Sequence, residues 1–171
     1  MIEVKDEFVL DIKYITKNNL MNEVLYQNYK CFLREGTYKK LKKANDKFKK
    51  LGFQIKIWDA YRPFSVQEYM WNKVHDVKYV SNPYVKTYHS KGNAVDITLC
   101  DLYGNELKMP TLFDDFSTNA KSNYIGNNVE IKENLNLLQK VMMECGFTFL
   151  ETEWWHFNDT DDYPIIKEDL F

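Results

Sequence analysis

Residues 87–99 read TYHSKGNAVDITL, and they place a carboxylate inside an apolar run. Within this stretch His89 precedes Asp96 by seven residues, and Gly92 lies between them. The apolar residues around Asp96 predict a buried strand over residues 93–100. A buried carboxylate costs free energy unless a neighbouring group compensates its charge. The rest of the chain must therefore supply that group.

The composition is typical of one globular domain. The chain has 171 residues and a formal net charge of −2, with 44% hydrophobic and 16% aromatic residues. This length allows about two-thirds of the unfolded surface to be buried, so we expect a single domain over residues 1–171. The near-neutral charge argues against nucleic acid as a partner. No apolar run approaches the ~20 residues that a membrane helix needs, so we expect no membrane partner either.

The start of the chain and its cysteines indicate a cytoplasmic protein. Residues 1–10 read MIEVKDEFVL and lack the basic and apolar regions of a secretory signal. Cys31, Cys100 and Cys145 are widely spaced and odd in number, which suits reduced thiols better than a disulfide framework. We expect each to be a small buried residue. No apolar seam in the sequence decides between a monomer and a homodimer.

Two elements are predicted before the opening stretch. Apolar residues at steps of three and four predict a helix over residues 38–51, with Thr37 as its N-cap and Gly52 at its end. The other face of this helix carries seven lysines, which we interpret as a solvated face rather than a binding stripe for phosphate or membrane. Alternating apolar and polar residues then predict a strand over residues 53–59.

The remaining pattern mixes helices and strands. Pro63 or Ser65 can open a helix that continues to residue 74, and a helix over residues 131–145 should stop at Gly146. Between them lies a long polar loop over residues 108–128, of a kind that is often functional. Two closing strands are predicted, over residues 147–150 and 154–158. No regular strand-helix-strand alternation appears, which favours an α+β fold with helices packed on a small, largely antiparallel central sheet.

The histidines and their acidic neighbours are candidates for a metal site. His75 falls near a helix end and is expected to be structural or exposed. His89, Asp96 and His156 offer two imidazoles and a carboxylate, a set of ligands that suits zinc. The alternative is a salt-bridged Asp96 beside two ordinary histidines, and spacing alone leaves both interpretations open.

Glu153 and Arg62 add possible catalytic groups. Glu153 lies three residues before His156, and a carboxylate near a metal-activated water can act as general base. Glu151 is a competing candidate. A fixed guanidinium at Arg62 can stabilise an oxyanion, although a pair with Asp59 that closes the turn is the simpler interpretation of its position.

Five blocks of the sequence resemble the zinc-dependent D-alanyl-D-alanine dipeptidases, the VanX-like enzymes. TYHSKGNAVDITL is similar to their pattern of a hydroxyl residue, a spacer and H-S-R/K-G-x-A-x-D, and ETEWWHF at 151–157 to their E-x-W-H. WDAYRP at 58–63 and MPTLFD at 109–114 resemble D-x-Y-R-P and M-G-x-x-F-D. Residues 11–20 resemble K-Y-x-T-x-x-N-F. The blocks occur in the family's order over nearly the whole chain.

The resemblance implies a role for each matched residue. One zinc ion per chain would be held by His89, Asp96 and His156, with Glu153 as catalytic base and Arg62 steadying the tetrahedral intermediate. The substrate would be a small D,D-dipeptide, gripped at its ammonium group by Thr87 and Asp114, with Tyr14 lining the pocket. The implied fold is the zinc D,D-peptidase (Hedgehog-like) fold. Thr87 stands where a serine is usual and Pro110 where a glycine is usual, and both changes concern substrate binding.

Three other functions compete with this interpretation. A D,D-carboxypeptidase acting on peptidoglycan stem peptides is the nearest, but such relatives tend to have E-P-W-H and an export signal. A catalytically silent zinc-binding relative is the second, although it would not need Glu153. A basic-patch protein, based on the lysine-rich helix, is the third. The sequence does not distinguish vancomycin resistance from D-alanine recycling.

Overall fold

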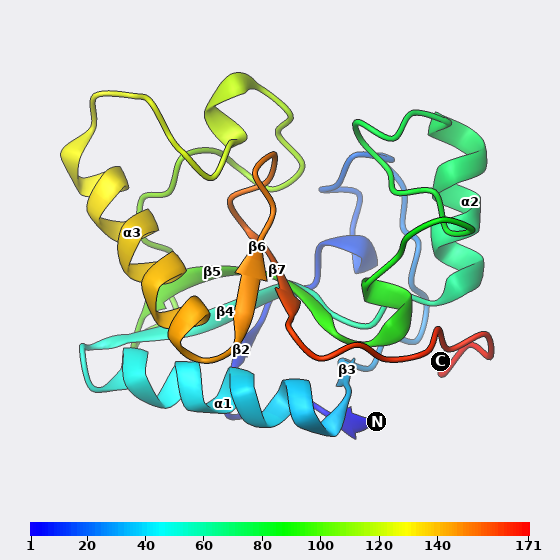
Figure 1. The fold of residues 1–171 in the computed structure, drawn as a ribbon, viewed down its shortest axis with the longest axis horizontal. Coiled ribbons are helices and arrows are strands. Elements are labelled where there is room, and N and C mark those ends of the chain that lie inside the picture. The colour runs from blue at the N-terminus through cyan, green and yellow to red at the C-terminus, as the bar shows by residue number, and fades with distance from the viewer.

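The computed structural model describes residues 1–171, which form a five-stranded sheet with three α-helices (Figure 1). The order across the sheet is β2-β4-β5-β7-β6. The strands are β2 (Val9–Leu10), β4 (Phe53–Asp59), β5 (Ala94–Asp101), β6 (Phe147–Phe149) and β7 (His156–Asp159). All neighbouring pairs are antiparallel except β2 with β4. The predicted α+β class and largely antiparallel sheet are confirmed.

A second, two-stranded sheet pairs β1 (Ile2–Glu3) with β3 (Phe32–Leu33). Neither of these strands was predicted, nor was β2. Each has only two residues, and so short a segment carries no recognisable alternation of apolar and polar side chains.

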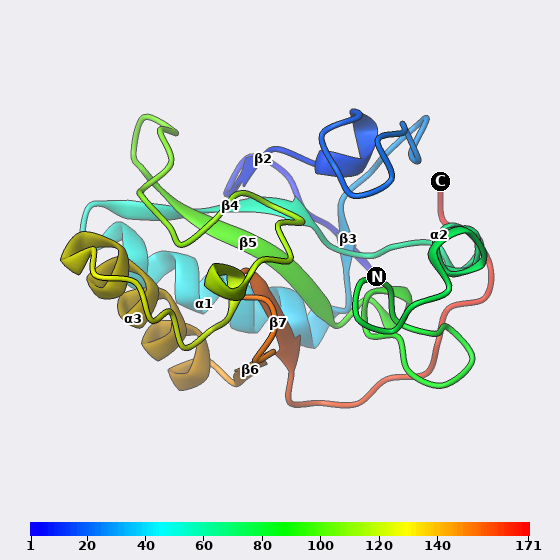
Figure 2. The ribbon, with the colours of Figure 1, turned by 90° about the horizontal axis from the view of Figure 1, so that it is seen from above.

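The helices lie in two places relative to the sheet (Figures 1 and 2). Helix α1 (Glu35–Lys49) packs against β4 and against α3 (Val129–Glu144), and α3 also contacts β6. Helix α2 (Phe64–Val74) lies apart from them, beside the C-terminal end of the chain. Single 3-10 turns are formed by η1 (Lys13–Ile15), η2 (His89–Lys91) and η3 (Thr118–Ala120). None of the helices is both long and apolar enough to cross a membrane.

The predicted start of α1 was wrong. The helix begins at Glu35 with Arg34 as N-cap, so Thr37 lies inside the first turn. The Thr37 hydroxyl donates instead to the Asp159 carboxylate, at 2.6 Å, across the interface between α1 and the end of β7. A buried carboxylate needs such donors, and this tertiary partner replaces the local capping role that the sequence suggests.

The other boundaries follow the sequence signals closely. Gly52 and Gly146 have φ values of +85° and +91° just after their helices, a backbone region that favours glycine. Asn128 caps α3 by accepting a hydrogen bond from the Ile131 amide at 3.2 Å. His75 follows α2 and is exposed, as expected. All three cysteines are free and buried, also as expected.

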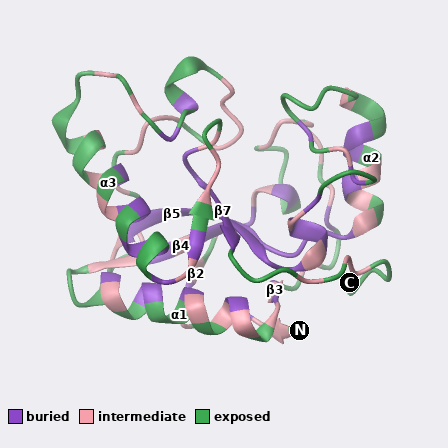
Figure 3. Ribbon diagram, viewed as in Figure 1, coloured by how far each residue is buried: buried purple, intermediate pink, exposed green.

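Burial is concentrated on the central strands (Figure 3). Seven of the eight residues of β5 are buried, which agrees with the apolar run that predicted it. The register of the sheet places Asp96 of β5 opposite Asp59 of β4 on one side and His156 of β7 on the other. The pairing with β4 is irregular between Ile57 and Asp59, and such bulges are common next to active sites. Three polar side chains therefore lie side by side on adjacent strands, where β4 ends and β7 begins.

Replacing the Thr37 hydroxyl tests the correction at α1. Thr37→Val is expected to lower the free energy of unfolding by about 1.5–3 kcal/mol, because the Asp159 carboxylate loses a donor. Thr37→Ser keeps the hydroxyl and should remain within about 1 kcal/mol of the wild type. Urea denaturation measures both values. Equal stability of the valine variant and the wild type would show that the hydrogen bond from Thr37 to Asp159 does not stabilise the fold.

Candidate metal centre and substrate cavity

Two histidines and one aspartate converge at the meeting point of three segments. His89 comes from η2, Asp96 from β5 and His156 from β7, and all three are buried. One ligand atom of each lies within 4.8 Å of the others. After His89, Gly92 turns the chain with φ +74°, and the strand predicted over residues 93–100 begins at Ala94. The turn brings the imidazole back over Asp96.

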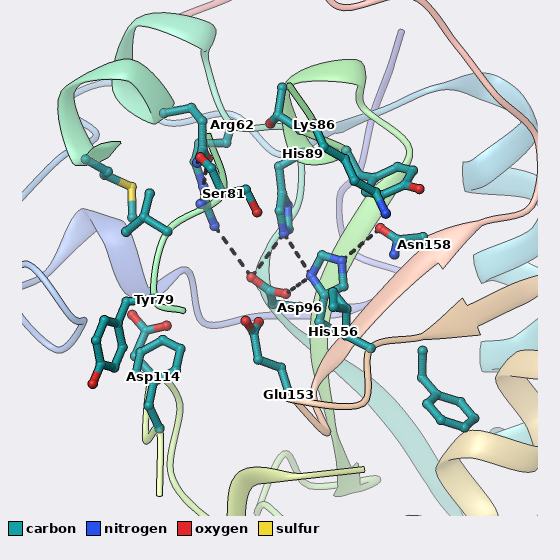
Figure 4. Close-up of a pocket in the computed structure, with 18 of the residues that line it drawn as sticks. Arg62, Tyr79, Ser81, Lys86, His89, Asp96, Asp114, Glu153, His156 and Asn158 are labelled. Atoms are coloured by element: carbon teal, nitrogen blue, oxygen red, sulfur yellow. Dashed lines mark hydrogen bonds and ion pairs between the residues drawn. The ribbon is translucent and has the colours of Figure 1, made fainter. Parts of the chain in front are cut away.

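Hydrogen bonds fix which nitrogen of each imidazole faces the group. His89 Nδ1 donates to the carbonyl of Ala60 at 2.7 Å, and His156 Nε2 donates to Asn158 Oδ1 at 2.8 Å. The remaining nitrogens, His89 Nε2 and His156 Nδ1, lie 3.3 Å apart. They also lie 3.3 Å and 2.9 Å from the two carboxylate oxygens of Asp96 (Figure 4).

This arrangement fits a metal ion. In the neutral form in which imidazole binds a metal ion, and with its other nitrogen donating, each ring directs a lone pair at the same point. The Asp96 carboxylate adds a third, because the histidines hold its pKa well below its usual range even though burial acts in the opposite direction. Three converging lone pairs on nitrogen and oxygen make a three-ligand set that suits zinc and leaves one position open. The Ala60 carbonyl and Asn158 Oδ1, which accept these hydrogen bonds, are the kind of outer partners that orient such ligands.

A cavity of about 340 Å³ opens beside this group. Every site residue predicted from the sequence lines it: Tyr14, Arg62, Thr87, His89, Asp96, Asp114, Glu153 and His156. The structure therefore brings together residues that lie up to 142 positions apart in the chain. The roles assigned to these residues remain predictions.

Arg62 is held in the cavity wall by a buried network. Its Nε and Nη2 donate to Asp59 Oδ2 at 3.0 and 2.8 Å, and its Nη1 donates to Gln67 Oε1 at 2.9 Å. The guanidinium lies over the ring of Tyr14, 4.8 Å from its centroid, and Nη2 is 3.7 Å from Asp96 Oδ2. The pair with Asp59 that the sequence suggested therefore exists, and it fixes the guanidinium at the edge of the metal group.

Glu153 lies in the turn that precedes β7. Figure 4 shows its carboxylate directed towards Asp96 and His156. Burial raises its pKa, and the charge of His156 acts in the opposite direction. The competing candidate, Glu151, also lines the cavity but is exposed. The following Trp154 is buried and donates through Nε1 to Thr111 Oγ1 at 2.9 Å, so the chain after Glu153 is firmly anchored.

Asp114 forms the acidic end of the cavity. Its backbone has φ +55°, and its Oδ2 accepts a hydrogen bond from the Leu20 amide at 2.8 Å. The Tyr14 hydroxyl lies 3.5 Å from the same oxygen. Burial of the carboxyl group raises the pKa of Asp114 to about 7. Thr87 is buried and lines the same cavity, and its hydroxyl donates to Ser90 Oγ at 3.3 Å.

Sequence reasoning missed two residues that support these groups. Gln67 on α2 accepts from Arg62 and donates to the Ser81 carbonyl at 2.8 Å. Asn158 orients His156. The i, i+2 spacing of His156 and Asn158 on one strand is a signal that could have paired them, because alternate residues share a face. Gln67 follows Arg62 by five residues, and nothing else in the sequence connects the two.

Removing the ionisable group at Asp114 should change how stability depends on pH. The folded-state pKa of about 7 exceeds the ordinary value of 3.8, so between these values the folded protein keeps a proton that the unfolded chain has released. Wild-type stability therefore falls as pH rises through this window, by at most about 1.4 kcal/mol per pH unit. Asp114→Asn cannot ionise, and asparagine tolerates positive φ.

We expect the stability of Asp114→Asn relative to the wild type to be greater at pH 8 than at pH 5. Urea denaturation of both metal-free proteins at the two pH values measures this difference. A difference that does not grow with pH would contradict the raised pKa of Asp114.

The outer hydrogen bond to His156 should affect metal affinity. Asn158→Leu removes the acceptor for Nε2, and loss of such a partner typically weakens metal binding about 10–100-fold. Asn158→Asp keeps an acceptor oxygen and should bind zinc nearly as tightly as the wild type. Competition with a chelator measures both affinities, and circular dichroism checks that the variants are folded. Wild-type affinity in the leucine variant would show that this hydrogen bond does not orient the ligand.

Comparison with known proteins agrees with this geometry. Residues 1–169 match the M15 peptidase family described as D-ala-D-ala dipeptidase. A D-alanyl-D-alanine dipeptidase of Escherichia coli (strain K12) is 31% identical over 161 residues, covering 93% of this chain and 83% of that protein. One from Enterococcus faecium is 28% identical over 179 residues, covering 90% and 87%.

A solved structure shares the fold. It is the D,D-pentapeptidase VanY of a VanB-type vancomycin resistance cassette, crystallised as a mutant with Zn(II), and it aligns with a TM-score of 0.52 at 14% identity. The alignment covers 79% of this chain and 76% of that one. Together with the match over residues 1–169, these findings show that the chain belongs to the D-alanyl-D-alanine dipeptidase family of M15 peptidases.

Proposed function

We propose that this protein is a zinc-dependent dipeptidase that hydrolyses D-alanyl-D-alanine to two molecules of D-alanine. The observation that carries the proposal is the convergence of His89, Asp96 and His156 within 4.8 Å, beside a cavity that also holds a carboxylate and a guanidinium. Membership of the family and the names of the curated relatives support the substrate. We further propose that residues 1–171 form one catalytic domain, since the cavity draws on residues from Tyr14 to Asn158.

Zinc suits the three ligands because neutral imidazole nitrogen and carboxylate oxygen are among its usual partners. A zinc ion held there would polarise the peptide carbonyl and make a water molecule more acidic. The structural relative that contains Zn(II) supports this choice of metal.

Glu153 is proposed as the general base. It lines the same cavity as the three ligands, and its carboxylate faces them (Figure 4). It accepts a proton from the water that attacks the peptide carbonyl, and later donates a proton to the amine nitrogen of the departing D-alanine. Glu151 is less suited to this task because its exposure to solvent leaves it without a fixed position.

Arg62 is proposed to stabilise the oxyanion. As the carbonyl carbon becomes tetrahedral its oxygen gains negative charge, and a donor that is already in place stabilises that charge without reorganising. The bonds to Asp59 and Gln67 supply this rigidity. Nη2 also lies 3.7 Å from Asp96 Oδ2, so the guanidinium borders the three proposed metal ligands.

Asp114, with Tyr14 and Thr87, is proposed to select the substrate. A carboxylate at the end of the cavity favours a free ammonium group, and a longer peptide presents an uncharged amide nitrogen there. Thr87 and Tyr14 complete the walls of a cavity of about 340 Å³, a size suited to a small ligand.

The alternative substrate is a peptidoglycan stem peptide ending in D-Ala-D-Ala, which a D,D-carboxypeptidase would cleave. This alternative is considered because the chain shares its fold with a D,D-pentapeptidase. The position of Asp114 favours the dipeptide, because a longer substrate would place an uncharged amide nitrogen, and not an ammonium group, beside this carboxylate. Incubating the zinc-loaded protein with D-Ala-D-Ala and with a pentapeptide ending in D-Ala-D-Ala separates the two, and cleavage of the pentapeptide alone would overturn the dipeptidase assignment.

Removing the Glu153 carboxylate tests the catalytic proposal. Glu153→Ala is expected to lose about 10²–10⁴-fold in kcat, the usual contribution of general acid–base catalysis, while still binding one zinc ion. Glu151→Ala is the matched control and should keep nearly full activity. Metal analysis and a D-alanine release assay measure the two properties. A fully active Glu153→Ala enzyme would refute the role of Glu153, and a protein without zinc binding would refute the metal centre.

A further inference from the structure

The charges that line the cavity are unevenly distributed. Four carboxylates face it, from Asp96, Asp114, Glu151 and Glu153. Two permanent cations also line it, Arg62 and Lys86. Arg62 is already bound by Asp59 at 2.8 Å, whereas Lys86 forms no ion pair with any residue of the chain. Lys86 is therefore the one cation of the cavity wall whose charge is not neutralised by the protein.

Lys86 and Asp114 lie on different sides of the metal group. Figure 4 shows Lys86 beside Asn158 and Asp114 beyond Glu153, with Asp96 and His156 between them. The Lys86 ammonium lies 5.0 Å from the ring centroid of Tyr88, a cation–π contact that favours this position over free solvent. Its backbone amide is bonded to the Asn82 carbonyl at 2.9 Å, which ties the residue to the cavity rim.

Asn158 adds a neutral donor at the same end. Its Oδ1 accepts the hydrogen bond from His156 at 2.8 Å, so the amide group is fixed with its orientation set. Its Nδ2 then has no acceptor within the protein and belongs to a residue that lines the cavity. A fixed N–H donor beside an unpaired ammonium is an arrangement that suits a carboxylate.

We propose that Lys86, assisted by Asn158, binds the C-terminal carboxylate of the dipeptide. This inference rests on the proposed function and specifies how that substrate lies in the cavity. The ammonium group of the substrate faces Asp114, its carboxylate faces Lys86, and the peptide bond crosses the metal group between them. The two ends of the cavity then pair with the two charged ends of a free dipeptide, so a substrate blocked at its C-terminus loses one of the two ion pairs.

Lys91 provides a matched control within the same loop. Its ammonium also lies near the Tyr88 ring, 5.6 Å from the centroid, but it is paired with Asp162 at 2.6 Å. It does not line the cavity that holds Asp96 and Glu153. Replacing Lys91 therefore removes one positive charge near the Tyr88 ring but leaves Lys86, the proposed partner of the substrate carboxylate, in place.

The test compares D-Ala-D-Ala with its C-terminal amide in zinc-loaded wild type, Lys86→Met and Lys91→Met. We expect the wild type to prefer the free acid by about tenfold in kcat/KM, as a charge-assisted hydrogen bond would give. Lys86→Met should lose this preference through a roughly tenfold higher KM for the acid, with little change in kcat or in the kinetics of the amide. Lys91→Met should keep the wild-type preference.

A binding measurement gives a second readout that does not require turnover. In the Glu153→Ala background, calorimetry should show that Lys86→Met weakens binding of D-Ala-D-Ala about tenfold and leaves binding of the amide unchanged. A preference for the acid that survives Lys86→Met, in kinetics or in binding, would overturn the carboxylate site while leaving the dipeptidase assignment intact. Failure of the wild type to hydrolyse D-Ala-D-Ala would instead overturn the proposed function, and the binding measurement would still test Lys86.

Discussion

The pairing of β5 with β7 is the constraint on which the site depends. It sets Asp96 directly opposite His156, and the pairing of β5 with β4 sets Asp59 opposite Asp96. A strand shifted by one residue would turn every one of its side chains to the other face of the sheet. The positions of two proposed metal ligands, Asp96 and His156, and of the aspartate that holds Arg62 thus follow from the register of these two strand pairs, whereas His89 is added by η2.

The parts of this fold that sequence reasoning could predict are the longer, strongly patterned ones. The strand over residues 53–59 and the helices near 38–51 and 131–145 follow from periodicity, and both glycine stops are where expected. The start of α1 could not be placed correctly, because Thr37 is engaged by Asp159, 122 residues away. At the site, residue types and family-like motifs led to the predicted ligands, whereas the supports from Gln67 and Asn158 arise from contacts that spacing alone does not reveal.

Arg62 shows that a structural and a functional interpretation of one residue need not exclude each other. From the sequence, a pair with Asp59 and a role at the oxyanion are alternatives. In the structure, the carboxylate that closes the turn also fixes two nitrogens of the guanidinium, while the charge still reaches the edge of the metal group. Catalytic electrostatics depend on donors that are in place before the reaction begins, so the structural pair is what would make the arginine useful.

The residues that line the cavity come partly from strands and partly from loops. Two of the three ligands belong to sheet strands, whereas Asp114 comes from the segment between β5 and α3, and Lys86 from the segment between α2 and η2. Loops tolerate insertion and replacement far better than the elements that they connect. Because of this separation, changes in two loop segments could alter which peptide the cavity accepts. The strands that carry Asp96 and His156 would not have to change.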